Sequence, residues 1–244
     1  MKTKSKESPL TKRAKTCRIA GMEQMKCKFK LVAFDLDGTI CNTLKDIASS
    51  LNRALAALGF STYSDDGVSG LIGKSIVYMC KHAVPEDRAE AWVDVRDGFL
   101  SDYAEHLCDT TVPYPEMPEL LHALKARGVT LAIVTNKPDP HAKKMIRTLF
   151  PEGDLFAYVQ GQCEAYPVKP DPAMLDLVRG DLGFTREETL YLGDMDVDLQ
   201  FAKNAGLKCV GCGWGYRGEA FLREAGAEHV ISHPLELLDI IDTL

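Results

Sequence analysis

No stretch of the 244-residue sequence approaches the roughly 20 consecutive apolar residues that a membrane-spanning helix needs. The basic residues at the start are not followed by an apolar segment of about 7–15 residues, so nothing indicates a secretory signal. Internal repeats and low-complexity tracts are also missing. These absences exclude a membrane-embedded protein and favour a cytoplasmic location.

The eight cysteines have no spacing typical of a disulfide framework, which agrees with reduced thiols in a cytoplasmic protein. Cys209 and Cys212 form a lone C-x-x-C pair, without a second pair or two nearby histidines. We therefore expect two half-buried thiols at the end of a strand, rather than a zinc or redox site.

Charge is unevenly spread along a chain whose net charge is −6. Residues 1–30 hold ten Lys and Arg against two Glu, a local charge of +8, so the remainder carries −14. An acidic body is a poor partner for the phosphates of nucleic acid, which argues against such a partner. For residues 1–29 the composition predicts a flexible, solvated leader.

The first predicted element is the apolar run at residues 30–36, which is typical of a buried parallel strand. A helix should follow, with Thr43 and Asp46 as a capping box and Gly59 at its end. Residues 60–112 read as helical, without the alternation of a strand. Pro113, Pro115 and Pro118 then break the pattern.

From Pro118 onward, short apolar strands alternate with amphipathic helices. This rhythm predicts an α/β fold, a parallel sheet with helices on both faces. The expected elements are helix 118–127, strand 129–134 ending at Thr135-Asn136, helix 138–149, strand 156–159, helix 172–182, strand 189–192, helix 195–205, strand 207–211, helix 218–225, strand 229–231 and helix 234–243.

The helical stretch interrupts this rhythm after a single strand, which indicates an inserted module. We therefore expect a core domain built from residues 30–42 and 116–244, with a helical cap at residues 43–115. In parallel sheets, ligands bind beyond the carboxyl ends of the strands. The predicted strands end at Asp35-x-Asp37, Thr135-Asn136 and Gly193-Asp194, so these polar groups should meet at one edge.

Two carboxylates two residues apart suit phosphoryl transfer, in which one attacks phosphorus and the other moves protons. Because a carboxylate and a phosphate repel each other, a divalent cation is expected between them. Asp35, Asp194 and the backbone carbonyl of Asp37 would suit Mg²⁺. Asp198 would hold a metal-bound water or Lys169. The alternatives are a calcium loop, which Ile40 and Asn42 contradict, and helix capping by Asp194.

Four motifs occur in order, each in its expected strand and loop context: Asp-Leu-Asp-Gly-Thr, Thr-Asn-Lys-Pro, Lys-Pro-Asp-Pro and Gly-Asp-Met-Asp-Val-Asp. Together they closely resemble the haloacid dehalogenase superfamily, from residue 30 to the end. The resemblance implies a Rossmann-like core and Mg²⁺ as cofactor. It also implies site residues and their roles: Asp35 as nucleophile and metal ligand, Asp37 as acid/base and metal ligand, Thr135 and Lys169 on the phosphate, and Asp194 and Asp198 at the metal.

The cap follows the first motif, which is similar to the phosphoglycolate phosphatase and β-phosphoglucomutase branches. Tyr114-Pro115-Glu116 and Trp214-Gly215-Tyr216-Arg217 look most like the phosphatases. The resemblance implies a phosphatase for a small phosphorylated metabolite, active as a monomer or homodimer. Asn136 is expected to contact substrate, and Lys74, in the loop from Gly70 to Ser75, to face its anionic tail.

Several other readings are open. A phosphomutase or a pyrophosphatase would use the same groups, and a phospho-ligand binding protein would have lost at least one of them. A dehalogenase would need neither Asp37 nor a metal. The pattern Gly213-x-Gly215-x-x-Gly218 suggests dinucleotide binding, but it falls at a late strand of a sheet whose earlier strand ends already form a phosphatase site.

Overall fold

The structure is a computed structural model that describes residues 28–244, so all but the end of the predicted leader lies outside the described residues. A six-stranded sheet with the spatial order β5-β4-β1-β6-β7-β8 forms its centre, and every neighbouring pair is parallel. The strands are β1 (Leu31–Phe34), β4 (Thr130–Pro138), β5 (Tyr158–Gln162), β6 (Thr189–Gly193), β7 (Lys208–Cys212) and β8 (His229–Ile231).

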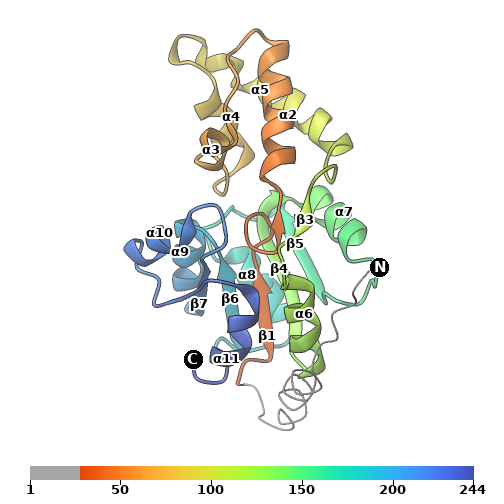
Figure 1. Ribbon diagram of the computed structural model, residues 1–244, viewed down its shortest axis with the longest axis vertical. Helices are drawn as coiled ribbons and strands as arrows, with labels where there is room; N and C mark the ends of the chain where they lie inside the picture. Colours follow the sequence, from red (N-terminus) through yellow and green to blue (C-terminus); the bar gives the residue numbers. More distant parts are fainter. Residues whose placement is uncertain (1–27) are drawn as a thin grey trace, which may run out of the picture.

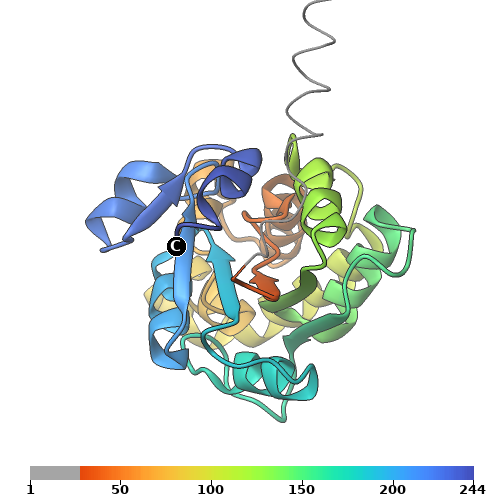
Figure 2. The same cartoon turned by 90° about the horizontal axis from the view of Figure 1, so that it is seen from below.

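Helices cover both faces of this sheet, as the alternation of strands and helices predicts (Figure 2). The cause is visible in β1, whose side chains alternate between the two faces. Val32 and Phe34 pack into one apolar cluster, with α6 (Met117–Ala126), α7 (Asp139–Leu149) and α11 (Leu237–Ile240). Leu31 and Ala33 pack into the other, with α8 (Ala173–Asp181) and α9 (Asp196–Ala205). The α/β fold with a parallel, doubly covered sheet is confirmed.

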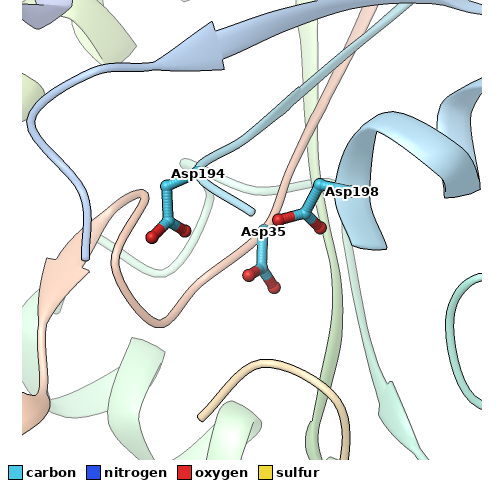
Figure 3. Close-up of side chains that lie close together, drawn as sticks. All are labelled: Asp35, Asp194 and Asp198. Carbon is cyan, nitrogen blue, oxygen red and sulfur yellow. The ribbon is translucent and has the colours of Figure 1, made fainter. Parts of the chain in front are cut away.

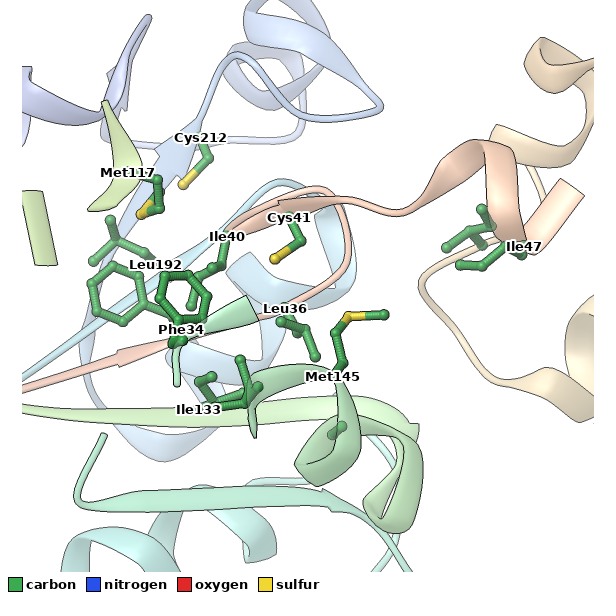
Figure 4. Packing of buried hydrophobic residues seen from close by; sticks show 14 of the residues in the cluster. Phe34, Leu36, Ile40, Cys41, Ile47, Met117, Ile133, Met145, Leu192 and Cys212 are labelled. Atoms are coloured by element: carbon green, nitrogen blue, oxygen red, sulfur yellow. The ribbon is translucent and has the colours of Figure 1, made fainter. Parts of the chain in front are cut away.

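The larger cluster extends from the sheet to Ile47, beyond the carboxyl ends of the strands (Figure 4). Phe34, Ile133 and Leu192 come from three neighbouring strands, and their register places them side by side. Their exclusion from water fixes the three strand ends relative to one another, because close-packed interiors resist displacement. The remaining core helices are α10 (Gly218–Glu224) and the 3-10 turn η2 (Pro234–Glu236).

A second group of helices lies beyond the carboxyl ends of the strands (Figure 1). Its members are α2 (Leu44–Ala57), α3 (Asp65–Ser69), α4 (Ile76–Ala83), η1 (Glu86–Ala91) and α5 (Trp92–Glu105). The chain enters and leaves the group through β2 (Cys41–Asn42) and β3 (Val112–Pro113), which pair antiparallel. The division into a core and a cap at residues 43–115 remains our proposal.

The predicted capping box of α2 is wrong. Thr43 precedes the helix but makes no side-chain cap, and its hydroxyl instead lies 2.7 Å from Tyr216 Oη. The Asp46 carboxylate is turned away from the helix start and accepts hydrogen bonds from Thr110 and Thr111. A local motif has here been overridden by contacts from distant parts of the chain.

Other differences concern the ends of elements. Strand β4 runs on to Pro138, beyond the expected end at Thr135-Asn136, because a register shift after Val134 lets the chain pair again with β5. The last helix is broken into η2 and the short α11.

Cys209 and Cys212 lie on β7 as free thiols, Cys209 partly exposed and Cys212 buried. Within residues 28–244, no helix combines the length and apolar character needed to cross a bilayer.

Candidate active site

Three segments bring carboxylates to the same edge of the sheet. Asp35 follows β1, Asp194 follows β6, and Asp198 lies in the first turn of α9 (Figure 3). Each is buried and offers one oxygen, and these oxygens all lie within 4.8 Å of one another. The register of β1 with β6 produces this meeting, since Phe34 and Leu192 are direct partners.

Lys169 is the buried cation of this cluster. Its Nζ lies 2.8 Å from Asp35 Oδ1 and 2.8 Å from Asp198 Oδ1, and it donates to Tyr191 Oη at 2.9 Å. Asp198 is held at both oxygens, because its second oxygen accepts from the backbone N–H of Met195 at 3.1 Å. Asp198 therefore holds Lys169, one of the two roles expected of it.

The charges in the cluster do not balance. Three carboxylates face one ammonium, which leaves two negative charges without a partner. Burial raises the pKa of Asp35 to about 6, against the opposing effect of Lys169 and with a further rise caused by Asp198. Burial and the charges of Asp198 and Asp35 raise the pKa of Asp194 well above its ordinary value. Such repulsion is what a bound divalent cation would relieve.

The residues present fit a magnesium ion. Asp35 Oδ1 is buried and accepts no hydrogen bond of normal geometry among the described residues, although Lys169 is near. Asp194 accepts one hydrogen bond at each oxygen, from Thr39 Oγ1 at 3.0 Å and from the Tyr216 N–H at 2.9 Å. Because a carboxylate oxygen has two lone pairs, Asp194 keeps one free at each. Hard oxygen donors and an excess negative charge suit Mg²⁺.

Asp37 occupies a different environment from Asp35. Its carboxylate pairs with Lys137 Nζ at 3.0 and 3.3 Å, and the same nitrogen donates to Tyr103 Oη at 2.6 Å. Tyr103 belongs to α5, so this contact joins the cap helices to the edge of the sheet. Sequence reasoning gave Lys137 no role, although it stands in the Thr-Asn-Lys-Pro motif.

Thr135 and Asn136 stand beside this group. The Thr135 hydroxyl is buried and accepts from the Lys137 N–H at 3.3 Å. The Asn136 amide donates to the carbonyls of Gly73 at 3.1 Å and Lys74 at 2.5 Å, and its oxygen accepts from the Lys169 N–H. Asn136 thus fastens the loop from Gly70 to Ser75 to the core, and its predicted contact with substrate remains untested.

A cavity of about 50 Å³ lies above Asp35 and Asp37, between the sheet edge and the cap helices. Its apolar wall comes from the cap and consists of Ile47, Ile72, Ile76, Met79 and Phe99. Lys74 does not line this cavity. Its ammonium lies 4.5 Å from the centre of the Tyr78 ring, on a larger groove that shares Ser75 with the cavity.

The loop after β7 packs on the acidic cluster instead of forming a dinucleotide site. A Cβ at Gly215 would lie 2.2 Å from the Asp194 side chain, and the Tyr216 N–H donates to that carboxylate. Trp214 Nε1 donates to the backbone carbonyl of Thr39 at 2.9 Å. Gly213 instead approaches β8, where a Cβ would lie 2.9 Å from the Ile231 carbonyl oxygen, and Gly218 has a φ of +75°. The glycine pattern is thus accounted for without a cofactor.

Known proteins resemble this chain over most of its length. Residues 32–212 match the family model described as haloacid dehalogenase-like hydrolase. A phosphoglycolate phosphatase from Mannheimia succiniciproducens is 32% identical over 225 residues, covering 89% of this chain and 100% of that protein. Another, from Aquifex aeolicus, is 33% identical over 213 residues, covering 87% and 97%. The crystal structure of a predicted phosphoglycolate phosphatase from Haemophilus somnus aligns with a TM-score of 0.79 at 30% identity, covering 87% and 98%.

Proposed function

This chain belongs to the haloacid dehalogenase-like hydrolase family and is a phosphatase, and we propose that it hydrolyses a small phosphomonoester such as phosphoglycolate through a phospho-aspartate on Asp35. The relatives named phosphoglycolate phosphatase align with this chain over nearly their whole length. Mg²⁺ is the proposed cofactor, with Asp35, Asp194 and the backbone carbonyl of Asp37 as its ligands and Asp198 behind them.

The opposed environments of Asp35 and Asp37 support this proposal most directly. Both line the cavity, but Asp35 lies between Lys169 and the acidic pair, whereas Asp37 pairs with Lys137 away from that pair. Two carboxylates in contrasting surroundings are what separate roles as nucleophile and as acid/base require. When bound, the metal would supply positive charge that lets a carboxylate approach a phosphate.

In the first step, an Asp35 oxygen attacks phosphorus while the bond to the leaving oxygen breaks. Asp37 gives its proton to that oxygen, so the alcohol departs neutral. Lys169 and the Thr135 hydroxyl hold the phosphoryl oxygens, which carry the charge that develops during transfer. In the second step Asp37 takes a proton from water, which attacks phosphorus, releases phosphate and restores Asp35.

The apolar cap wall of the cavity favours a short leaving group. Side chains such as Ile47, Ile72 and Met79 offer no hydrogen bonds to the hydroxyl groups of a hexose phosphate, which the phosphomutase alternative requires. The predicted cytoplasmic location and the monomeric or dimeric state stay predictions.

The proposal is tested by phosphate release from phosphoglycolate with purified protein. EDTA should abolish turnover and added Mg²⁺ should restore it. Asp35→Asn should lower kcat by about 1,000-fold or more, because the nucleophile is lost. A thermal unfolding midpoint close to that of the wild type would show that the variant is folded. Turnover in EDTA equal to that in Mg²⁺, or full activity of the variant, would contradict the proposal.

A further inference from the structure

Lys137 is the one cation among the described residues that line the cavity above Asp35 and Asp37. Lys74 and Lys169 line the neighbouring, larger groove. The Lys137 side chain is only 2% exposed, which is rare for a lysine unless its charge is paired, and its partner here is Asp37 at 3.0 Å. Its ammonium thus stands where the polar floor of the cavity meets the apolar wall of the cap.

The charge of Lys137 and one donor of Tyr103 are available at this place. Lys137 Nζ contacts both oxygens of Asp37, at 3.0 and 3.3 Å, and the Tyr103 oxygen at 2.6 Å, so its three N–H groups have partners. When Asp37 carries the proton that it gives to the leaving oxygen, the charge of Lys137 loses its counter-ion. The Tyr103 hydroxyl accepts from Lys137, and its own hydrogen has no acceptor among the described residues. A positive charge and a neighbouring O–H donor match a carboxylate.

The distance from the reacting atoms also fits. Asp37 must lie beside the leaving oxygen to give it a proton, and Lys137 Nζ is 3.0 Å from the Asp37 carboxylate. A group attached one carbon away from the leaving oxygen would therefore come within reach of Lys137. A longer tail would meet the apolar wall formed by side chains such as Met79 and Phe99.

We propose that Lys137 and Tyr103 form an anion subsite that selects phosphomonoesters with a carboxylate one carbon from the leaving oxygen. This inference rests on the proposed function and names its substrate class. It transfers the recognition of the anionic tail from Lys74, in the cap loop, to a lysine of the core. Because Tyr103 lies on α5, the subsite is complete only when the cap is in place.

The test compares kcat/KM for phosphoglycolate with kcat/KM for 2-hydroxyethyl phosphate, in which a hydroxymethyl group replaces the carboxylate. Because both substrates need Asp37, any effect of a substitution on Asp37 changes both kcat/KM values and cancels in their ratio. Lys137→Met should lower this ratio by about 10- to 100-fold, because it removes the positive charge beside the carboxylate, and Tyr103→Phe by about 3- to 10-fold, because it removes a hydrogen bond to that carboxylate. The loss should appear mainly as a higher KM for phosphoglycolate.

Lys144→Met is the matched control, because Lys144 Nζ donates to the carbonyl of Ala104 on α5 but does not line the cavity. Its ratio should equal that of the wild type. If Lys137→Met does not fold, Tyr103→Phe decides, since it removes a single hydroxyl. Unchanged ratios in both variants, or a loss in Lys74→Met instead, would overturn the subsite. A wild-type enzyme equally active on both substrates would overturn the subsite alone, whereas one silent on both would overturn the proposed function with it.

Discussion

Two glycines allow the backbone to close around the Asp194 carboxylate. Gly38 has a φ of +85°, a region that favours glycine, and a Cβ there would lie 2.3 Å from Asp194 Oδ2. Gly215 approaches the same side chain from the loop after β7, at 2.2 Å for an added Cβ. Because neither glycine has a side chain, the backbone lies directly against the carboxylate on two sides and fixes its position.

Gly215→Ala should therefore push Asp194 out of place. Because the added methyl meets a buried side chain, we expect a loss of about 1–3 kcal/mol in the free energy of unfolding. Activity with Mg²⁺ should fall at least 10-fold. Urea unfolding and phosphate release measure the two effects.

Gly180→Ala provides the control for this substitution. Gly180 lies in α8 with no atom within 4 Å of an added Cβ, so alanine should leave activity unchanged and raise stability by up to about 1 kcal/mol. Equal behaviour of the two variants would contradict the close packing at Asp194.

At the scale of elements, the connection between sheet and cap depends on Asp46. Its carboxylate accepts from the backbone N–H and the hydroxyl of both Thr110 and Thr111, which lead into β3. Burial would raise the pKa of Asp46, but these hydrogen bonds outweigh burial and hold the pKa below its ordinary value of 3.8. The charged form is therefore bound more tightly in the folded protein than in the unfolded chain.

Asp46→Asn should lower the free energy of unfolding by about 1–3 kcal/mol at pH 7. A carboxylate whose pKa is lowered by folding stabilises the folded state at pH values above its ordinary pKa. This stabilisation is lost as the pH falls through the pKa of the folded state. The gap between wild type and variant should thus shrink below about pH 4. Denaturant unfolding at several pH values measures the gap. Asp87→Asn, at an exposed position of η1, is the control, and a gap that stays constant down to pH 2 would contradict this role.

The sequence predicts most elements because apolar runs and their spacing decide which residues leave water. The strand at 30–36 and the helix ended by Gly206 are found nearly as expected. The pairing of β2 with β3 could not be foreseen, since two-residue strands carry no periodicity. Thr43 and Asp46 matched a capping box, yet Tyr216 and Thr110 compete for them from far along the chain.

The candidate site likewise has a part that the sequence predicts and a part that it does not. Asp35, Asp194 and Lys169 meet because motifs at the ends of parallel strands must share an edge. The pairing of Lys137 with Asp37 and Tyr103 depends on how the cap sits on the core, and sequence spacing does not encode that. The place of Lys74 in the cap loop predicts a contact with the anionic tail of the substrate, whereas its contact with the Tyr78 ring leaves no signal in the sequence.

At the scale of the whole molecule, the protein carries a net negative charge and also gathers an excess of negative charge in its site. The described chain buries three carboxylates around one lysine. Folding without metal must therefore work against repulsion, and a cation that binds only the folded state stabilises it by mass action.

Mg²⁺ at about 100 times its Kd should add about 2.7 kcal/mol, a rise of roughly 5–10 °C in Tm for a chain of this size. Asp194→Asn removes one unbalanced charge, so its metal-free Tm should exceed that of the wild type and should not respond to Mg²⁺. Thermal scans with and without the metal measure both effects. Asp196→Asn, an exposed neighbour outside the cluster, should keep the wild-type response. A full Mg²⁺ response in Asp194→Asn would contradict the proposed ligand.

The antiparallel pair formed by β2 and β3 places the two crossings between sheet and helices next to each other. A cut at both crossings therefore leaves two chain ends that a short turn can rejoin, with β1 and β4 undisturbed. The molecule offers a natural grafting point, where the helices of another phosphatase can be transplanted to bring a new substrate preference to the same catalytic edge.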